Sequence, residues 1–312
     1  FLYIFFLVLA LNLSFFSTTN VNAKAFFIDE IHISEKLENN FNKDILINKG
    51  FKKAFKELMK ILLKSKELNK TNNVSINKIK SMVETFSIKE EKFIDKSYSL
   101  NLGVSFNKKK IFNYLESKNI FPTQIIKEKF LFIPIIIDQS NTSVFVFSGN
   151  PVYEMWNEIE KNFFLIEYVL PSEDLEDLNL IKKNFLELEN YDFDPIIEKY
   201  LLDYSIIALI FKDTNEIKIL SKINMKEKKI IKNNSFKTMN LNNTENLKFL
   251  INDLKIIYED LWKDKNLINT SIKLPLSIQI DNKNFNFSSK FEKTLDNIDL
   301  ISNYSISKFN KD

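Results

Sequence analysis

The chain has 312 residues, of which 45% are hydrophobic and 27% charged, and its formal net charge is only +3. So weak a charge excess excludes the strongly basic surface of nucleic-acid-binding proteins, and we expect no nucleic-acid partner. The count of cysteines is 0. This excludes disulfides, thiol nucleophiles, cysteine metal sites and a lipid-modified amino-terminal cysteine.

Residues 1–25 have the layout of a secretory signal peptide, with an apolar stretch, a polar spacer and small residues at Ala23 and Ala25. Cleavage fits after either alanine and would export the mature chain, most simply to the periplasm. The alternative is an uncleaved membrane anchor, but a spanning helix needs about 20 apolar residues and this stretch is shorter. The segment begins without methionine and has no positive residue before Lys24, so we expect upstream residues to be missing.

The first module, residues 26–125, should open with a strand at Phe26–Ser34 and a helix at about Asp44–Leu63. Apolar residues recur along this helix at three- and four-residue steps, which predicts one buried face, with Gly50 on the less apolar side. Ser75 is suited to capping a second helix. The residues expected on the inner side of that helix are Ile76, Ile79, Met82, Val83 and Phe86.

Strict alternation of apolar and polar residues from Tyr98 to Phe106 predicts a strand with one buried and one solvated face. A preceding strand at Ser87–Ile94 should pair with it as a hairpin, and Asn107 should cap a short helix. We therefore expect an α+β fold of two or three small α/β modules. Their mixed, largely antiparallel sheets should be packed by amphipathic helices.

Pro122 marks the boundary to a second module, residues 126–240, whose continuous apolar run from Phe130 predicts a strand covered on both faces. A further helix, begun by Pro195, should bury its apolar residues, Leu201 included. The other expected elements of this module are strands at Ser143–Phe147, Phe163–Leu170, Ser205–Phe211, Glu216–Leu220 and around Ile230, and helices begun by Pro151 and Ser172.

A carboxyl-terminal module, residues 241–312, should combine helices and strands, and it could be truncated. Its apolar stripe predicts a long helix. The elements expected are helices at Thr244–Lys263 and near Ser289–Leu295, and strands at Ser271–Ile280 and Leu300–Ile306.

Four stretches of the mature chain carry a resemblance. They are NKGFKKAFKELMKILL, YSLNLGVSFNKKKIFNYL, FLFIPIIID followed by SGNPVYEMW, and LIEYVLPSEDLEDLNLI followed by IIEKYLLDYSIIALIF. In this order they resemble a proteobacterial family of exported proteins known only as domain of unknown function number two thousand and sixty-six. The family pattern often has glycine at Ser172 or Glu173 and arginine where this chain has lysine, so the match is divergent. The resemblance implies export and a mixed α/β fold, and it implies no activity.

The sequence offers little catalytic chemistry. Its single histidine, His32, alternates with Ile31 and Ile33 in the opening strand and has no cluster of partners, so we expect a solvated strand residue. The 3 glycines are too widely spaced for a phosphate-binding loop. We expect no metal site, no catalytic histidine and no cofactor.

The strongest polar cluster runs from Ser172 to Asp177 (SEDLED). Asp174 and Asp177 could bind a cation or serve as acid and base. The simpler interpretation is structural, with Ser172 as the N-cap of a helix whose acidic first turn complements the helix dipole.

Asn150, Pro151 and Trp156 form the best candidate for a recognition surface, because aromatic residues anchor interfaces. A tryptophan on an amphipathic helix is more often a core residue, and we favour that interpretation for Trp156.

Two function classes remain open. The first, which we favour, is an exported, non-enzymatic binding or assembly accessory whose partner is an envelope protein or a cell-wall component. It would reach a membrane only through an uncleaved leader. The second is a carboxylate-dependent envelope hydrolase that uses Asp174 and Asp177. Convergence of these carboxylates with other acids in a cleft would favour the enzyme, whereas a solvated helix start would favour the accessory.

Overall fold

The computed structural model describes residues 26–37, 41–138, 140–159, 164–213, 216–226, 228–237, 240–269, 274–279, 285–296, 298, 301 and 304–305. The expected signal peptide, residues 1–25, lies outside these described residues. The chain divides into two compact units, and each is described by itself. The first unit contains the described residues up to Met59, Asn69–Pro122 and those from Asn269 onward, and the second contains Lys60–Leu68 and Thr123–Ile268.

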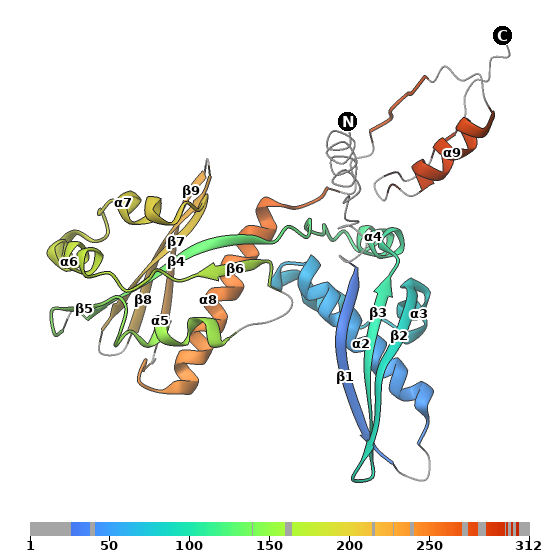
Figure 1. The fold of residues 1–312 in the computed structure, drawn as a ribbon, viewed down its shortest axis with the longest axis horizontal. Helices are drawn as coiled ribbons and strands as arrows, with labels where there is room; N and C mark the ends of the chain where they lie inside the picture. Colours follow the sequence, from blue (N-terminus) through green and yellow to red (C-terminus); the bar gives the residue numbers. More distant parts are fainter. Residues whose placement is uncertain are drawn as a thin grey trace, which may run out of the picture. The chain divides into compact units, whose positions relative to one another are not determined.

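The first unit is built on a three-stranded antiparallel sheet with the strand order β1-β3-β2 (Figure 1). The order strand, helix, helix, strand, strand, helix is the one that the sequence predicts, with a short 3-10 helix added. The elements are β1 (Phe27–Lys36), α2 (Lys43–Leu62, whose last turn belongs to the second unit), η3 (Ser65–Thr71, which belongs to the second unit up to Leu68), α3 (Ile76–Met82), β2 (Val83–Ile94), β3 (Ser97–Phe106) and α4 (Lys108–Glu116), and later α9 (Phe285–Asp296).

Helix α2 packs its apolar stripe on one face of this sheet. Phe55 meets Phe106 of β3 and Tyr114 of α4 edge to face, with ring centroids 6.2 and 6.0 Å apart. The predicted caps of the next two helices are confirmed, because Ser75 Oγ accepts the N–H of Lys78 and Asn107 Oδ1 accepts the N–H of Lys110.

Gly50 lies on the packed face of α2, not on its less apolar side as expected. It is buried, and a Cβ at this position would stand 2.4 Å from Leu102 Cδ1 and 2.9 Å from Ile33 Cδ1. The helix and the sheet therefore approach each other where the helix has no side chain. Periodicity misplaced Gly50 because a glycine carries no hydropathy signal that marks a buried face.

Gly50→Ala should destabilise the protein by about 1 kcal/mol, because overpacking against the terminal methyl groups of Leu102 and Ile33 costs more than the gain in helix propensity. The sign is informative, since glycine to alanine on an exposed helix face gains roughly 1 kcal/mol through helix propensity. Urea unfolding followed by circular dichroism measures the change. A stabilised variant would contradict a close approach of α2 to the sheet at Gly50.

Strand β2 begins at Val83, earlier than expected. Helix α3 ends at Met82, so Phe86 belongs to the strand, where it lies opposite Val104 of β3 and is 47% exposed. The expectation that Val83 and Phe86 lie on the inner side of a helix is therefore wrong. The apolar spacing fits both structures here, and pairing with β3 decides between them.

The second unit contains a mixed six-stranded sheet with the order β5-β4-β7-β8-β9, and β6 also pairs with β4. β4 is parallel to β6 and β7, whereas its pairing with β5 and the pairs β7–β8 and β8–β9 are antiparallel. The α+β class expected from the sequence is thereby confirmed. The strands are β4 (Glu128–Asp138), β5 (Ser143–Phe145), β6 (Ile166–Val169), β7 (Tyr204–Lys212), β8 (Glu216–Met225) and β9 (Lys228–Lys237).

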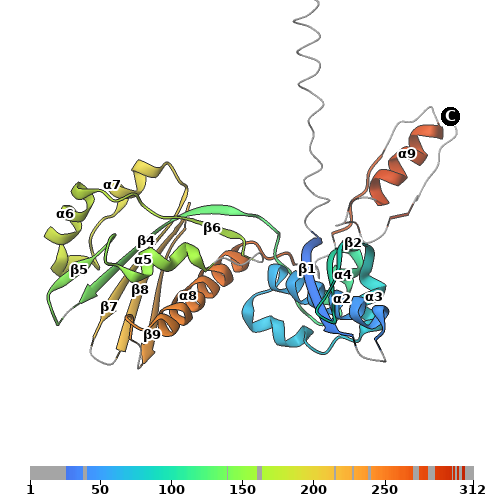
Figure 2. The same ribbon diagram turned by 60° about the horizontal axis from the view of Figure 1, so that its bottom comes forward.

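Helices cover both faces of this sheet, as Figures 1 and 2 show. One core contains Phe130, Phe132 and Trp156 together with the apolar stripe of α8, and the other contains Ile133, Ile181 and Ile196. Helix α8, which we expected in a third module, thus contributes to the core of the second unit. The helices are α5 (Pro151–Met155), η4 (Trp156–Glu158), α6 (Leu175–Lys183), η5 (Phe185–Glu187), α7 (Asp194–Ile197), η6 (Glu198–Tyr200) and α8 (Thr244–Lys265).

Some expected elements differ or fall outside the described residues. Leu201 is 92% exposed and has a φ of 52°, because η6 ends there with a left-handed residue. The described part of the expected strand at Ser271–Ile280, residues 274–279, has no strand, and most of the expected strand at Leu300–Ile306 lies outside the described residues. Among the helices of the described residues, none has the length and apolar character that crossing a membrane requires.

Candidate functional site

A groove of about 720 Å³ runs between strand β5 and helix α6 of the second unit. β5 stands at one end of the strand order and, within the described residues, pairs with β4 alone. Figures 1 and 2 both place α6 beside β5. The groove is lined by residues 142–148 on the strand side and by Glu173, Asp174, Leu175, Leu178, Lys182 and Phe185 on the helix side.

The strand side of the groove is fixed by the turn between β4 and β5. Asp138, buried at the end of β4, accepts the N–H of Asn141 at 3.1 Å and pairs with Lys212 Nζ at 3.2 Å. After this turn, Val144 lies opposite Ile137 in the antiparallel ladder, and its side chain is buried. The edge of β5 is therefore held in place by buried contacts on its inner side.

Asn150 fixes the far end of this wall and is not a surface residue. It is fully buried, its Nδ2 donates to the carbonyl oxygens of Pro134 at 3.0 Å and Phe145 at 3.1 Å, and its Oδ1 accepts the N–H of Val152 at 3.0 Å. Pro151 follows in the first turn of α5, where its fixed φ suits a helix start. The side chain of Asn150 thus ties β5 to β4 and begins α5.

Trp156, the third member of that candidate recognition surface, lies in the core. Its exposed fraction is 0%, its ring stacks on Phe132 with centroids 3.7 Å apart, and Tyr168 meets it edge to face at 5.2 Å. The ammonium group of Lys255 lies 5.1 Å from the same ring and donates to the carbonyl of Ile159. The burial agrees with the core interpretation, so no recognition surface is built on Trp156.

Asp174, and not Ser172, is the N-cap of α6. Its Oδ1 accepts the N–H of Glu176 at 2.7 Å, whereas the N–H of Ser172 donates to the hydroxyl of Tyr200 at 2.9 Å. Both residue types cap helices well, and Asp174 immediately precedes the first helical residue, Leu175. The expectation that Ser172 caps the helix is therefore wrong. A polar side chain of the same short stretch, Asp174, is the cap.

Asp174 and Asp177 share one lysine. Lys199 Nζ lies 3.1 Å from Asp174 Oδ2 and 2.7 Å from Asp177 Oδ1, and the Asp177 side chain is only 2% exposed. The hydrogen bond from Lys199 lowers the pKa of Asp174, and the N–H of Glu176 acts in the same direction. A carboxylate held in its charged form by an ammonium group is a poor proton donor, so this arrangement is suited to fixing α6.

Asp174→Ala should lower the melting temperature by a few degrees, because α6 loses its cap. Asp174→Asn should leave it nearly unchanged, since an amide oxygen caps equally well. Thermal unfolding of the two variants beside the parent chain measures this difference. Equal destabilisation by both variants would show that the charge toward Lys199 matters more than the cap.

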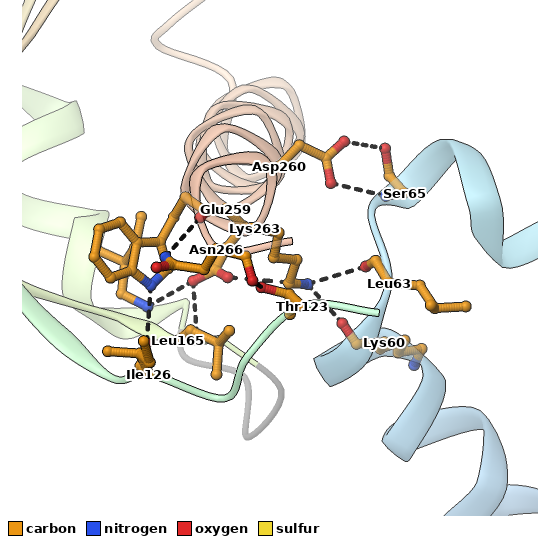
Figure 3. A network of polar contacts seen from close by, with 12 residues as sticks. Lys60, Leu63, Ser65, Thr123, Ile126, Leu165, Glu259, Asp260, Lys263 and Asn266 are labelled. Atoms are coloured by element: carbon orange, nitrogen blue, oxygen red, sulfur yellow. Dashed lines mark hydrogen bonds and ion pairs between the residues drawn. The ribbon is translucent and has the colours of Figure 1, made fainter. Parts of the chain in front are cut away.

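A second polar cluster, on α8, was not found from the sequence (Figure 3). Glu259 and Lys263 are 2% and 4% exposed. Glu259 Oε1 accepts the N–H groups of Leu165 and Ile166, both at 2.7 Å, while Lys263 Nζ donates to the carbonyl of Lys60 at 2.6 Å. The two charged groups lie 3.9 Å apart, within one unit.

Burial shifts the pKa of both groups. It raises the pKa of Glu259 to about 7 and lowers that of Lys263. Glu259 is not among the residues that line the groove, so its titration affects the stability of the unit and not the groove itself. The sequence did contain a signal for this buried pair. Glu259 and Lys263 lie one helical turn apart, and each directly follows a buried aromatic residue, Tyr258 or Trp262.

The rest of the described residues add no catalytic constellation. His32 is exposed beside a hollow of about 250 Å³ on the first unit's sheet, as expected from its place in the strand. Within the described residues, no group of three or more histidine and acidic side chains could hold a metal ion. Neither a protein-family model nor a curated protein matches the chain.

Proposed function

We propose that the chain is an exported, non-enzymatic binding or assembly accessory of the bacterial envelope, and that the groove along β5 takes an extended peptide segment of a partner protein. The observation that carries this proposal is the groove itself. It joins the terminal strand of a sheet to a helix wall that offers apolar and charged side chains. Such a combination suits a peptide whose backbone pairs with the strand and whose side chains contact the helix.

The strand edge favours an extended peptide over a compact ligand. A peptide that adds to β5 as a further strand gains main-chain hydrogen bonds, while alternate side chains point toward the helix wall and give specificity. Residues 142–148 line the groove beyond the three paired residues of β5, so the edge can accept more than a single contact.

The lining indicates the character of this peptide. Leu175 is 78% exposed and Phe145 is 38% exposed, so both offer apolar surface that a ligand can cover. Glu173, Asp174 and Lys182 place charges of both signs on the helix wall. A segment with apolar residues at alternate positions, flanked by charged residues, fits this lining.

The alternative of a carboxylate-dependent hydrolase gains no support from the described residues. Lys199 contacts both Asp174 and Asp177, and Asp174 is committed to a helix cap. An acid and base pair needs two groups with pKa values held apart, one of them raised, whereas the pKa of Asp174 is lowered.

Export and a periplasmic location are part of the same proposal. They rest on residues 1–25 and on the resemblance to an exported family, and the partner is accordingly sought among envelope proteins.

Selection of displayed peptides against the purified chain tests the groove. Leu175→Glu should weaken binding of the selected peptides by roughly tenfold or more, measured by fluorescence anisotropy. Leu186→Glu is the matched control, because Leu186 is 90% exposed in η5 and does not line the groove. Equal losses in both variants, or no selected peptide, would contradict the proposal. Binding of cell-wall fragments alone would assign a different partner class.

A further inference from the structure

Strand β2 of the first unit is a long edge strand with exposed apolar residues. It stands at the end of the strand order and, among the described residues, pairs with β3 alone. Its residues from Glu84 to Ile94 are all exposed, and the exposed fractions of Phe86, Ile88 and Phe93 are 47%, 38% and 63%. Edge strands of this kind readily pair with another strand unless something covers them.

The apolar residues before Glu90 belong to the inner face of the sheet, the face that α2 covers. Phe86 lies opposite Val104 and Ile88 lies opposite Leu102, and both partners in β3 are fully buried. Phe86 also meets Phe51 of α2 edge to face at 5.1 Å. This end of β2 thus continues an apolar layer that stops at an open edge.

A β-bulge between Ile88 and Glu90 shifts the alternation of the strand by one residue. After the bulge, Glu91 lies opposite the buried Leu100, and Phe93 lies opposite Tyr98. The inner face of β2 therefore carries Phe86, Ile88, Glu91 and Phe93, and its outer face carries Ser87, Glu90 and Lys92.

We infer that β2 pairs antiparallel with β2 of a second copy of this chain, about a two-fold axis beside the bulge. In this register Phe86 faces the partner's Phe93, and Ser87 faces the partner's Lys92. The two three-stranded sheets then form one continuous sheet, and the exposed phenylalanines of each edge cover each other. A two-fold pair is isologous, so each contact occurs twice.

The bulge selects this register. Paired residues of neighbouring strands must point to the same face, and a shift of one residue breaks that match. With Phe86 opposite the partner's Phe93, inner residues meet inner residues and outer residues meet outer ones on both sides of the axis. Neighbouring registers instead set an inner residue against an outer one beside the bulge.

The charges of β2 favour a second copy as the occupant. The strand carries two lysines, Lys89 and Lys92, and three glutamates, Glu84, Glu90 and Glu91. In the inferred register Lys89 faces the partner's Glu90 on both sides of the axis. Opposite charges directly across two strands are favourable, whereas like charges there are not. At Lys89 and Glu90 the edge is therefore complementary to itself, and the pairing exchanges the exposed ion pairs that these two residues make within the chain with Asp29 and Lys92.

Disulfide trapping tests this pairing, because the chain has no cysteine of its own. The variant with both Ser87→Cys and Lys92→Cys should form a covalent dimer under mild oxidation, since facing Cα atoms of an antiparallel pair lie within disulfide reach. Within one chain the two positions are about 16 Å apart along the strand, too far for a bond. Each single variant is the control and should stay without the crosslink.

Sedimentation equilibrium supplies a second readout. The parent chain should show a reversible dimer, and Phe93→Lys should shift it to monomer. Ile231→Lys is the matched control, because Ile231 is 68% exposed on β9, the terminal strand of the other sheet. A monomer at every concentration, crosslinking by single variants as readily as by the double variant, or a dimer that Phe93→Lys leaves intact would each overturn the inference.

Discussion

Replacing Trp156 by alanine should lower the free energy of unfolding of the second unit by about 3–5 kcal/mol. The indole is fully buried and lies on Phe132 at a centroid distance of 3.7 Å, so its removal leaves a large cavity between the sheet and α8. Trp156→Phe should cost much less. It keeps the stacked ring, and the indole N–H it removes makes no hydrogen bond to the described residues.

Urea unfolding can follow both variants through the fluorescence of Trp262, because the chain has 2 tryptophans and the second lies in the same core. An alanine variant as stable as the parent chain would contradict the burial of Trp156. Trp156 would then again be a candidate for a recognition surface.

The stability of the second unit should fall as the pH rises from about 5 to 8, and Glu259→Gln should remove much of that dependence. The folded-state pKa of Glu259, about 7, lies above its ordinary value of 4.5. The folded chain therefore keeps a proton that the unfolded chain releases, and raising the pH through this interval favours unfolding. Complete ionisation of the buried carboxyl corresponds to a loss of about 3 kcal/mol.

Free energies of unfolding at pH 5 and pH 8 test this expectation, with Glu245→Gln as the matched control. Glu245 lies in the first turn of the same helix, and its side chain is 86% exposed, so its replacement should leave the pH dependence unchanged. The lowered pKa of Lys263 acts in the opposite sense and toward alkaline pH, as its proton is released earlier in the folded chain. If the difference between the parent chain and Glu259→Gln were the same at both pH values, Glu259 would not titrate in this interval.

The same buried pair explains how two segments are held on α8. Glu259 accepts backbone N–H groups at the start of β6, and Lys263 donates to backbone carbonyls at the end of α2 (Figure 3). Breaking a buried pair by removing one partner leaves an uncompensated charge, which costs more than the pair contributes. The main effect of the pair is therefore to fix the positions of these segments in the second unit, and its contribution to the net stability is small.

Periodicity was sufficient for the elements whose burial is one-sided or complete. The alternation from Tyr98 to Phe106 correctly predicted strand β3, and the continuous apolar run from Phe130 correctly predicted strand β4. The apolar stripe after Thr244 correctly predicted helix α8. In each case, local hydropathy and tertiary burial favour the same structure, so a single sequence carries enough information.

The failures come from positions where local and tertiary preferences diverge. Phe86 has the spacing of a helix residue but pairs with β3, and Gly50 carries no hydropathy signal although it occupies the closest approach of α2 to the sheet. Leu201 is apolar yet exposed, because the chain needs a left-handed residue there to leave η6. The structure at such positions depends on tertiary contacts with residues that are distant in the sequence.

The candidate site was only partly visible in the sequence. Asp174 and its helix were recognised, but the groove also needs residues 142–148, which reach α6 only through the pairing of β5 with β4. Asn150 and Trp156 stood out by residue type. Asn150 supports this wall from inside, whereas Trp156 belongs to the other core of the sheet, with Phe132 and α8. The sequence pattern alone predicts neither that β5 lies opposite α6 nor which way the side chains of Asn150 and Trp156 point.

Hydrogen exchange with and without a bound peptide shows whether the groove takes an extended segment as an added strand. We expect a peptide selected against the full chain to slow exchange of the backbone amides within residues 142–148, with smaller changes at the start of α6. Peptide binding that leaves exchange along β5 unchanged, or that protects residues elsewhere in the chain instead, would contradict it.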